Sequence, residues 1–323
     1  MLCSIIVLTY NSKLEKIYAT LNSVIGQESL EKIEIIIADD GSKKNFFEEI
    51  RYFLETKGVN NYKLIANEKN RGTVENFYSG VKIAKGRYIK ALGCGDLLYK
   101  KDTINRFCTF MQEKNKKIVF GLMKSFKGID SNINYWDCTI PMDIKAFRES
   151  NLEKVNRNII SWGKLISGAS MIFETHILIK LVDEIRGKVV YCEDFIQIIA
   201  LVNNIKIEFL NEYIVWYELG EGISTSNNSM WRERIKKDYD SLFVYLERKY
   251  KDNPYILRRV KKQHLGGYPK LFRGGIKFLT DPGMFFISIK TKFQKRQGLY
   301  TGEEQCGFLN DINTMNYKKT NYE

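Results

Sequence analysis

The sequence has little of what metal clusters and disulfide frameworks require. Its 323 residues include only two histidines and four prolines. The six cysteines are scattered, with no CxxC pair and no neighbouring histidine, so a zinc site is not expected. Lone thiols without a secretion signal are typical of a reducing compartment. We therefore expect a cytoplasmic protein.

Long apolar runs and phosphate-binding loops are also missing. The longest candidate for a membrane span, Met284–Ile289, is far shorter than the ~18 apolar residues that a spanning helix needs. The apolar run Ile5–Leu8 has no basic segment before it, which indicates a first core strand instead of a signal peptide. The turn that follows, Thr9–Ser12, matches neither GxGxxG nor GxxxxGK[ST]. A dinucleotide-binding fold and a P-loop are therefore not supported.

Positive charge is concentrated in one part of the chain. Residues 231–300 hold 18 Lys and Arg against 6 Asp and Glu, while the rest of the chain holds 33 against 32. The hydrophobic content of 44% is enough for a sizeable core. The charge asymmetry therefore concerns a binding partner of the basic segment and not the fold.

The first hundred residues alternate strand-like and helix-like patterns. Predicted strands at 3–9, 34–38, 62–66 and 87–92 are each followed by polar turn residues, and helical patterns lie between them. Continuous apolar strands separated by helices predict a mostly parallel sheet covered on both faces. Ligands of such sheets bind at the carboxyl ends of the strands.

The rhythm changes beyond residue 118. We expect strands at 118–122, 169–173, 206–210 and 213–217, and a helix at 193–203. Gly, Ser, Thr and Asn cluster at 222–230. We place a boundary there, between a domain at 1–225 and a basic, mainly helical extension at 226–323.

Several ordered motifs carry a family resemblance. They are Ile5–Asn11, Leu21–Gln27, Glu34–Ser42, Asn70-Arg71-Gly72 with Asn76, and Ala84–Ile89. In this order and spacing they resemble the opening of family 2 glycosyltransferases with the GT-A fold, of the type found in bacterial polysaccharide synthesis. The likeness is close over residues 3–100 and loose over 160–225.

The resemblance implies a nucleotide-sugar site at the strand ends. Asp39 would accept a hydrogen bond from the uracil N3–H, and Asp39 and Asp40 would face the crevice without a role in the core. Thr9 and Tyr10 would flank the base, and Arg71 would contact the base or the diphosphate. The remaining expected members of this site are Asn11, Gly72, Asn76, Gly95 and Asp96. An ordinary Asx turn at Asp39-Asp40 and a solvated loop arginine at Arg71 are the alternatives.

The metal motif departs from the family. Relatives typically carry an Asp-X-Asp-Asp-like cluster, whereas this chain has Gly93-Cys94-Gly95-Asp96. Asp96 is the expected ligand of Mg²⁺ or Mn²⁺, because phosphate oxygens and waters complete the shell of such ions. Glu218 is a weaker candidate for a second ligand. The missing carboxylates put the metal requirement in doubt.

The Glu193-Asp194 pair resembles the family's Glu-Asp pair, whose Asp is the catalytic base. Acidic residues also favour helix N-termini for electrostatic reasons alone. Trp162 and Gly168 are expected at the acceptor pocket, although Trp162 has a plain core position as its alternative. The segment 217–226 resembles the loop that closes over the donor in relatives.

Together these residues predict an inverting hexosyl- or N-acetylhexosaminyltransferase. It would use a nucleotide-sugar donor, UDP-sugars being favoured, and a saccharide acceptor that is lipid-linked. A GT-A module that binds nucleotide sugars without catalysis is the alternative. Nucleic-acid binding is not expected, because no recognised nucleic-acid-binding motif accompanies the basic segment.

The basic segment at 231–300 interleaves cations with aromatic and aliphatic residues. This pattern fits a helix on an anionic membrane surface, which would place the protein at the inner face of the plasma membrane. A solvated basic face and a homo-oligomer interface remain open as alternatives.

Overall fold

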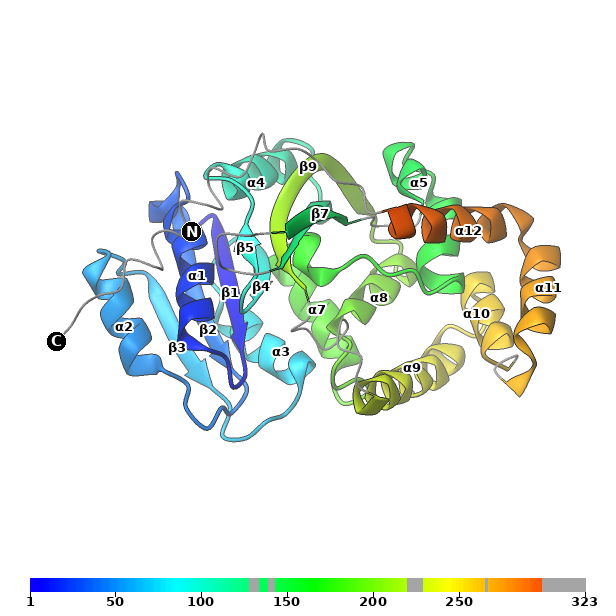
Figure 1. The fold of residues 1–323 in the computed structure, drawn as a ribbon, viewed down its shortest axis with the longest axis horizontal. Helices are drawn as coiled ribbons and strands as arrows, with labels where there is room; N and C mark the ends of the chain where they lie inside the picture. Colours follow the sequence, from blue (N-terminus) through cyan, green and yellow to red (C-terminus); the bar gives the residue numbers. More distant parts are fainter. Residues whose placement is uncertain (128–133, 139–142, 220–228, 265–266, 298–323) are drawn as a thin grey trace.

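The computed structural model describes residues 1–127, 134–138, 143–219, 229–264 and 267–297. Within these residues, one nine-stranded sheet has the order β3-β2-β1-β4-β8-β6-β9-β5, with β7 paired to β6. The sheet runs through the centre of the molecule (Figure 1). Its strands are β1 (Cys3–Thr9), β2 (Ile33–Asp39), β3 (Tyr62–Ala66), β4 (Tyr88–Gly93), β5 (Leu97–Leu98), β6 (Ile118–Lys127), β7 (Asn134–Cys138), β8 (Met171–Glu174) and β9 (Ile207–Glu218).

The N-terminal half of the sheet is parallel, as expected. β1 pairs in parallel with β2 and β4, and β2 pairs in parallel with β3. Helices α1 (Leu14–Ile25), α2 (Phe47–Thr56) and α4 (Thr103–Glu113) pack on one face of the sheet, and α3 (Thr73–Ile83) packs on the other. Because both faces are covered, β1 and β2 are buried at almost every position and are mostly apolar.

The other half of the sheet is mixed, which corrects the expectation of a mostly parallel sheet. β8 is antiparallel to β4 and β6, β7 is antiparallel to β6, and β5 is antiparallel to β9. Helices and short helical turns, joined by irregular segments, connect the strands of this half. They are α5 (Ile144–Arg148), α6 (Leu152–Asn156), the π-helical turn η2 (Arg157–Ser161), the 3-10 turns η3 (Gly168–Ser170) and η4 (Glu193–Phe195), α7 (Thr175–Ile185) and α8 (Ile196–Val202).

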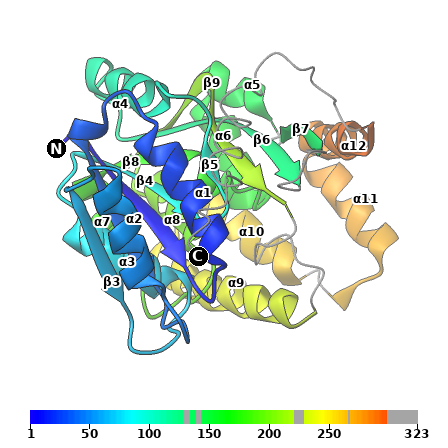
Figure 2. The ribbon, with the colours of Figure 1, turned by 60° about the vertical axis from the view of Figure 1, so that its left-hand side comes forward.

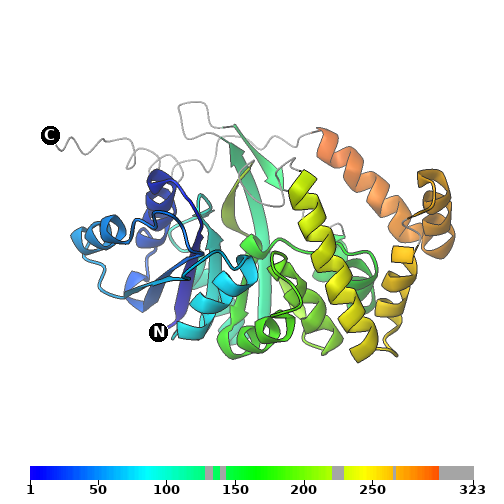
Figure 3. The same cartoon turned by 90° about the horizontal axis from the view of Figure 1, so that it is seen from below.

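In the described part of the chain, four helices follow the sheet: α9 (Ser229–Lys249), α10 (Pro254–His264), α11 (Lys270–Thr280) and α12 (Pro282–Gln297). Figures 2 and 3 show them gathered on the side of the molecule away from β3. α9 and α10 share the main core, to which they contribute Leu242, Phe243, Leu246, Ile256 and Val260.

α11 and α12 form an outer hairpin with far fewer buried side chains. The predicted boundary at 225/226 falls within 220–228, outside the described residues, and stays a prediction. No helix in the described ranges is long and apolar enough to cross a membrane.

Candidate active site

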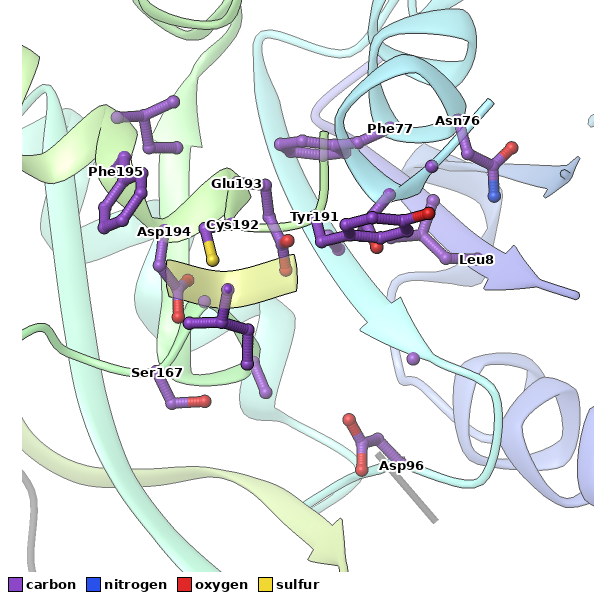
Figure 4. A pocket seen from close by; sticks show the side chains of 18 of the residues that line it. Leu8, Asn76, Phe77, Asp96, Ser167, Tyr191, Cys192, Glu193, Asp194 and Phe195 are labelled. Carbon is purple, nitrogen blue, oxygen red and sulfur yellow. The ribbon is translucent and has the colours of Figure 1, made fainter. Parts of the chain in front are cut away.

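A cavity of about 720 Å³ lies at the carboxyl ends of β1 and β4. Figure 4 shows Asp96 on one side of it and Glu193 and Asp194 on another. The sequence-predicted residues in its lining are Thr9, Tyr10, Asp40, Gly72, Asn76, Asp96, Gly168, Glu193 and Asp194. Segments almost 200 residues apart in the chain therefore meet around one space, as a site assembled from strand ends requires.

Asp39 is committed to the loop that follows β2. Its carboxylate accepts hydrogen bonds from the Thr9 hydroxyl (2.9 Å), the Ser42 backbone N–H (2.7 Å) and the Ser42 hydroxyl (2.6 Å). The side chain is buried and lies outside the cavity lining. The expectation that this carboxylate faces the crevice without a structural role is therefore wrong. It holds the end of β1 against the turn after β2.

Asp40 lines the cavity, but it also has a structural role. Its two oxygens accept from the side chain of Asn67 and from the backbone N–H groups of Arg71 and Gly72, each at 2.9 Å. These bonds fix the loop that leads into α3. Asn76, on the first turn of α3, donates to the carbonyl of Ala38 at 3.0 Å, and its buried side-chain oxygen has no partner.

Asp96 lies on the opposite side and has Glu218 beside it. The backbone N–H of Glu218, at the end of β9, donates to the Asp96 carboxylate at 3.0 Å. Burial raises the pKa of Asp96 to about 7. Lys90 on β4 is fully buried nearby, donates to the carbonyl of Ala169 at 2.8 Å, and has its pKa lowered to about 8 by burial.

Glu218 fills the space that a side chain at residue 95 would occupy. A Cβ atom on Gly95 would lie 2.1 Å from Glu218 Oε2. Oε1 forms an ion pair with Lys16 at 2.8 Å, whereas Oε2 is buried without a hydrogen-bond partner. The Glu218 carboxylate of β9 thus takes the space that a side chain at residue 95 would need. No group of three or more His, Cys, Asp or Glu suited to a metal occurs among the described residues.

Asp194 and Glu193 form the 3-10 turn η4 before α8, so the predicted helix starts with a tighter turn than expected. The Gly168 backbone N–H donates to the Asp194 carboxylate, and a Cβ atom at 168 would lie only 2.6 Å from Asp194 Oδ1. Burial raises the pKa of both carboxyl groups well above the usual range, and the charge of Asp194 adds to the rise for Glu193.

Asp238 of α9 positions the segment before this turn. Its carboxylate accepts from the backbone N–H groups of Val190 (3.0 Å), Tyr191 (2.6 Å) and Cys192 (3.0 Å). Three donors compensate for burying the charge. Asp238 was not predicted as a site residue, because nothing in the local sequence links it to a turn more than forty residues earlier.

Other lining residues were also missed. They include Tyr191, which precedes η4, and Trp231 and Tyr239, which lie on α9. The ring centroids of Tyr191 and Trp231 are 5.2 Å apart in an edge-to-face arrangement. α9 therefore completes the wall of the cavity, although it belongs to the predicted extension.

Four other predicted residues lie outside the lining. Asn11 accepts a hydrogen bond from the Lys43 backbone, and Arg71 points a largely exposed side chain toward Glu75, 3.7 Å away. Gly95 lies behind Glu218. Trp162 is buried, and its indole N–H donates to Asp281 at 2.8 Å, while its neighbour Gly163 lines the cavity. Most of the predicted donor loop, at 220–226, is outside the described residues.

Curated relatives of the chain include glycosyltransferases. It is 27% identical over 135 residues to the glycosyltransferase GlyG of Streptococcus pneumoniae, covering 42% of this chain and 43% of GlyG. It is 23% identical over 262 residues to an uncharacterized glycosyltransferase of Methanocaldococcus jannaschii, covering 80% and 83%. A third relative, an uncharacterized protein of the same archaeon, is 33% identical over 103 residues, covering 30% of this chain and 44% of that protein. The chain thus spans less than half of two of these relatives.

Solved structures share the fold. TarS of S. aureus (residues 1–349, with UDP-GlcNAc) aligns with a TM-score of 0.54 and 20% identity, covering 75% of this chain and 67% of that one. The mannosyltransferase PcManGT of Pyrobaculum calidifontis (with GDP-Man and Mn²⁺) aligns with a TM-score of 0.52 and 13% identity, covering 90% and 84%. The GT-A fold predicted from the motifs is confirmed.

The family model "Glycosyl transferase family 2" matches residues 4–166, just over half of the chain. With the fold and the strand-end cavity described above, this match makes the chain a member of glycosyl transferase family 2.

Proposed function

We propose that the protein transfers a sugar from a nucleotide-sugar donor to a hydroxyl of a saccharide acceptor, with inversion at the anomeric carbon. One observation carries the proposal: Asp96 and Asp194 line the same cavity from different sides (Figure 4). One carboxylate can serve the departing diphosphate while the other faces the incoming hydroxyl. The transferred group is a hexosyl or N-acetylhexosaminyl unit in cell-surface polysaccharide synthesis.

The nucleotide half of the site is formed by Thr9, Tyr10, Asp40, Gly72 and Asn76. A UDP-sugar is the favoured donor. TarS, which shares the fold, is described in complex with UDP-GlcNAc.

Asp194 is the proposed general base. Its raised pKa suits a group that must accept a proton near neutral pH. The acceptor oxygen forms a bond to the anomeric carbon while the bond from that carbon to the diphosphate oxygen breaks. The acceptor proton passes to the Asp194 carboxylate, and the nucleoside diphosphate leaves with the bonding electron pair. Glu193 precedes the base in the same turn, and the charge of Asp194 raises the pKa of Glu193.

Asp96 and Glu218 fit a hard divalent cation. The unpartnered Oε2 of Glu218 beside Asp96 is a free oxygen ligand, the type that Mg²⁺ and Mn²⁺ prefer. When bound, such an ion stabilises negative charge on the leaving diphosphate. Calorimetric titration of Mn²⁺ in the presence of UDP tests this assignment. Glu218→Gln should weaken Mn²⁺ about 10-fold, since one charged ligand is lost, whereas Glu212→Gln on the same strand should not. Equal affinities in wild type and Glu218→Gln would contradict it.

The hairpin of α11 and α12 is the proposed membrane contact. Its exposed apolar side chains, here called the hairpin surface, are Leu271, Phe272, Phe278, Leu279 and Phe286. Leu271 is 92% exposed and Leu279 79%, which is costly in water unless another surface covers them. Arg273 and Lys277 lie on the same helix as Leu271. Apolar residues with flanking cations suit an anionic bilayer surface, and hence a lipid-linked acceptor at the inner face of the plasma membrane.

Vesicle co-sedimentation tests the membrane contact. Leu271→Asp/Leu279→Asp should weaken binding to phosphatidylglycerol vesicles at least ~10-fold. The control Leu152→Asp/Val244→Asp changes exposed apolar residues elsewhere by the same charge and should bind like wild type. Equal binding by both double variants would contradict the membrane contact. Concentration-dependent dimers that only the hairpin variant loses would favour the oligomer interface instead.

The proposed activity is tested with a panel of nucleotide sugars and Mn²⁺. UDP-sugars should raise the melting temperature most, and one of them should release UDP when a lipid extract supplies the acceptor. Stabilisation without any release or product would favour the non-catalytic binding module. Absence of both would overturn the proposal.

A further inference from the structure

Two cations of α10 lie between the cavity and the hairpin. Arg259 packs against Gly163, which lines the cavity: a Cβ atom at residue 163 would lie 2.8 Å from Arg259 Nη1. One helical turn later, the ammonium of Lys262 lies 4.1 Å from the centre of the Trp162 ring. Trp162 in turn donates to Asp281, just before α12 begins. The two side chains thus connect the wall of the site to the base of the hairpin.

Arg259 has no anionic partner within the described part of the chain. Its Nε atom is buried without a hydrogen-bond partner, and its nearest aromatic neighbours are Tyr239 and Phe243, each with a ring centre 5.4 Å from Cζ. Burial lowers its pKa, and no carboxylate offsets this effect. The favourable energy of stacking on two rings is smaller than the free-energy cost of burying a charged donor that makes no hydrogen bond.

Lys262 lies in a similar environment. Burial and the neighbouring cations Arg259, Lys277 and Arg258 lower its pKa to about 8, and only Asp281 opposes them. Asp281 is already shared: it accepts from Trp162, and the Nε of Arg157 lies 3.6 Å from it. We call Arg157, Arg259 and Lys262 the cation cluster. Among the described residues, Asp281 is the one carboxylate that Arg157 and Lys262 share, so the cluster carries excess positive charge.

We propose that the cation cluster binds the phosphate or diphosphate of the acceptor, at the link between its saccharide and its lipid. This inference rests on the function proposed above and names the chemical class of the acceptor. The order in space matches such a molecule. The saccharide lies in the cavity beside Gly163, the phosphates meet Arg259 and Lys262, and the lipid continues to the hairpin surface. Guanidinium and ammonium groups whose positive charge is not fully balanced are the donors that phosphate oxygens require.

The basic surface of α10 offers matched controls. Arg258 and Lys261 are exposed on the same helix, each one residue before a member of the cluster. Arg259→Gln/Lys262→Gln and Arg258→Gln/Lys261→Gln remove the same charge from the same helix. A general electrostatic attraction would fall equally in both. Specific phosphate binding would be lost only in Arg259→Gln/Lys262→Gln.

The test uses farnesyl diphosphate as the probe, with binding followed by calorimetry and phosphorus NMR. Arg259→Gln/Lys262→Gln should weaken the probe about 10- to 100-fold, as expected for the loss of two charge-assisted contacts. Arg258→Gln/Lys261→Gln should stay within about 2-fold of wild type. Arg259→Lys/Lys262→Arg keeps the charge and should retain most of the affinity, which separates loss of the site from misfolding. Equal weakening in both Gln pairs would overturn the inference.

Further arms identify the source of the phosphate. Inorganic pyrophosphate should bind more weakly than farnesyl diphosphate but show the same dependence on Arg259 and Lys262. Phosphatidylglycerol vesicles should respond to the hairpin variant and not to the cluster variant. The reverse pattern would assign the cluster to a phospholipid headgroup and refute an acceptor site.

UDP binding separates this inference from the proposed function. UDP and farnesyl diphosphate should bind together, and the cluster variant should bind UDP like wild type. Displacement of farnesyl diphosphate by UDP would mean that the probe occupies the donor site, which contradicts a separate acceptor site. If wild type binds no nucleotide, the proposed function fails first, whatever the cluster does.

Discussion

The two sides of the cavity are built in different ways. The proposed nucleotide side is formed where neighbouring parallel strands end, such as Thr9 at the end of β1 and Asp40 directly after β2. The acceptor side is held by contacts between distant segments: Asp238 with residues 190–192, and Trp162 with Asp281. Changes on the acceptor side should therefore lower turnover while nucleotide binding persists.

Among the residues that position other groups, the largest effect is expected for Gly168→Ala. The new methyl group would lie 2.6 Å from Asp194 Oδ1, so the carboxylate must move. Displacing a reacting group by about 1 Å costs on the order of 10²-fold in rate. We expect the kcat for transfer to fall by that factor while the Kd for UDP is unchanged.

Gly283→Ala serves as the control for this variant, because nothing lies within 4 Å of a Cβ atom at that position. A Gly168→Ala enzyme with wild-type kcat would contradict the claim that Gly168 positions Asp194 on the acceptor side.

Asp238→Asn should have the next largest effect. An amide offers fewer acceptor positions to the three N–H groups of residues 190–192. Leaving a buried donor unpaired costs about 1–3 kcal/mol. We expect a lower melting temperature and a kcat reduced about 10-fold, with UDP affinity retained. Asp240→Asn, an exposed neighbour on α9, should change neither quantity, and equal effects of the two substitutions would refute a positioning role.

Asn76→Ala should act on the other side of the cavity. Its side chain donates to the Ala38 carbonyl at the end of β2, and removing a buried side-chain partner costs about 1 kcal/mol. UDP affinity measured by calorimetry should fall about 5- to 10-fold, with kcat at saturating donor nearly unchanged. A fall in kcat without weaker UDP binding would invert the division between the two sides.

The pH dependence gives the smallest and most specific signal. Burial raises the pKa of Asp194, so the carboxylate stays protonated, and unable to act as a base, to a higher pH than usual. Turnover should therefore rise with pH through this raised pKa and level off above it. The rising limb should lie well above the ordinary Asp value of about 3.9. A profile that is flat between about pH 5 and about pH 8 would contradict a buried base.

The same division explains what the sequence could predict. Strand-end motifs are local, so the parallel half of the sheet was predicted correctly. Thr9, Asp40 and Asn76 lie in the cavity lining, and their binding of a nucleotide sugar stays a prediction. The position of Asp39 was not predicted correctly, because its bonds to Thr9 and Ser42 depend on how two loops meet.

Residues that act across long distances left no local signal. Asp238 and Tyr239 lie in a basic helix, and only packing brings Tyr239 to the cavity and Asp238 to the backbone of residues 190–192. Glu218 was a weak candidate from the sequence, because its position in the site depends on the space that Gly95 leaves by having no side chain. The strands of the other half were expected, but their antiparallel pairing was not predicted, because short strands joined by irregular segments do not show the direction of pairing.

The most direct test of the account compares turnover and donor binding in Asp194→Asn. Loss of the general base should lower kcat about 10²- to 10⁴-fold, while the Kd for UDP stays at the wild-type value and Asp240→Asn behaves like wild type. Near-normal transfer by Asp194→Asn would contradict the central claim that carboxylates on two sides of one cavity act on donor and acceptor.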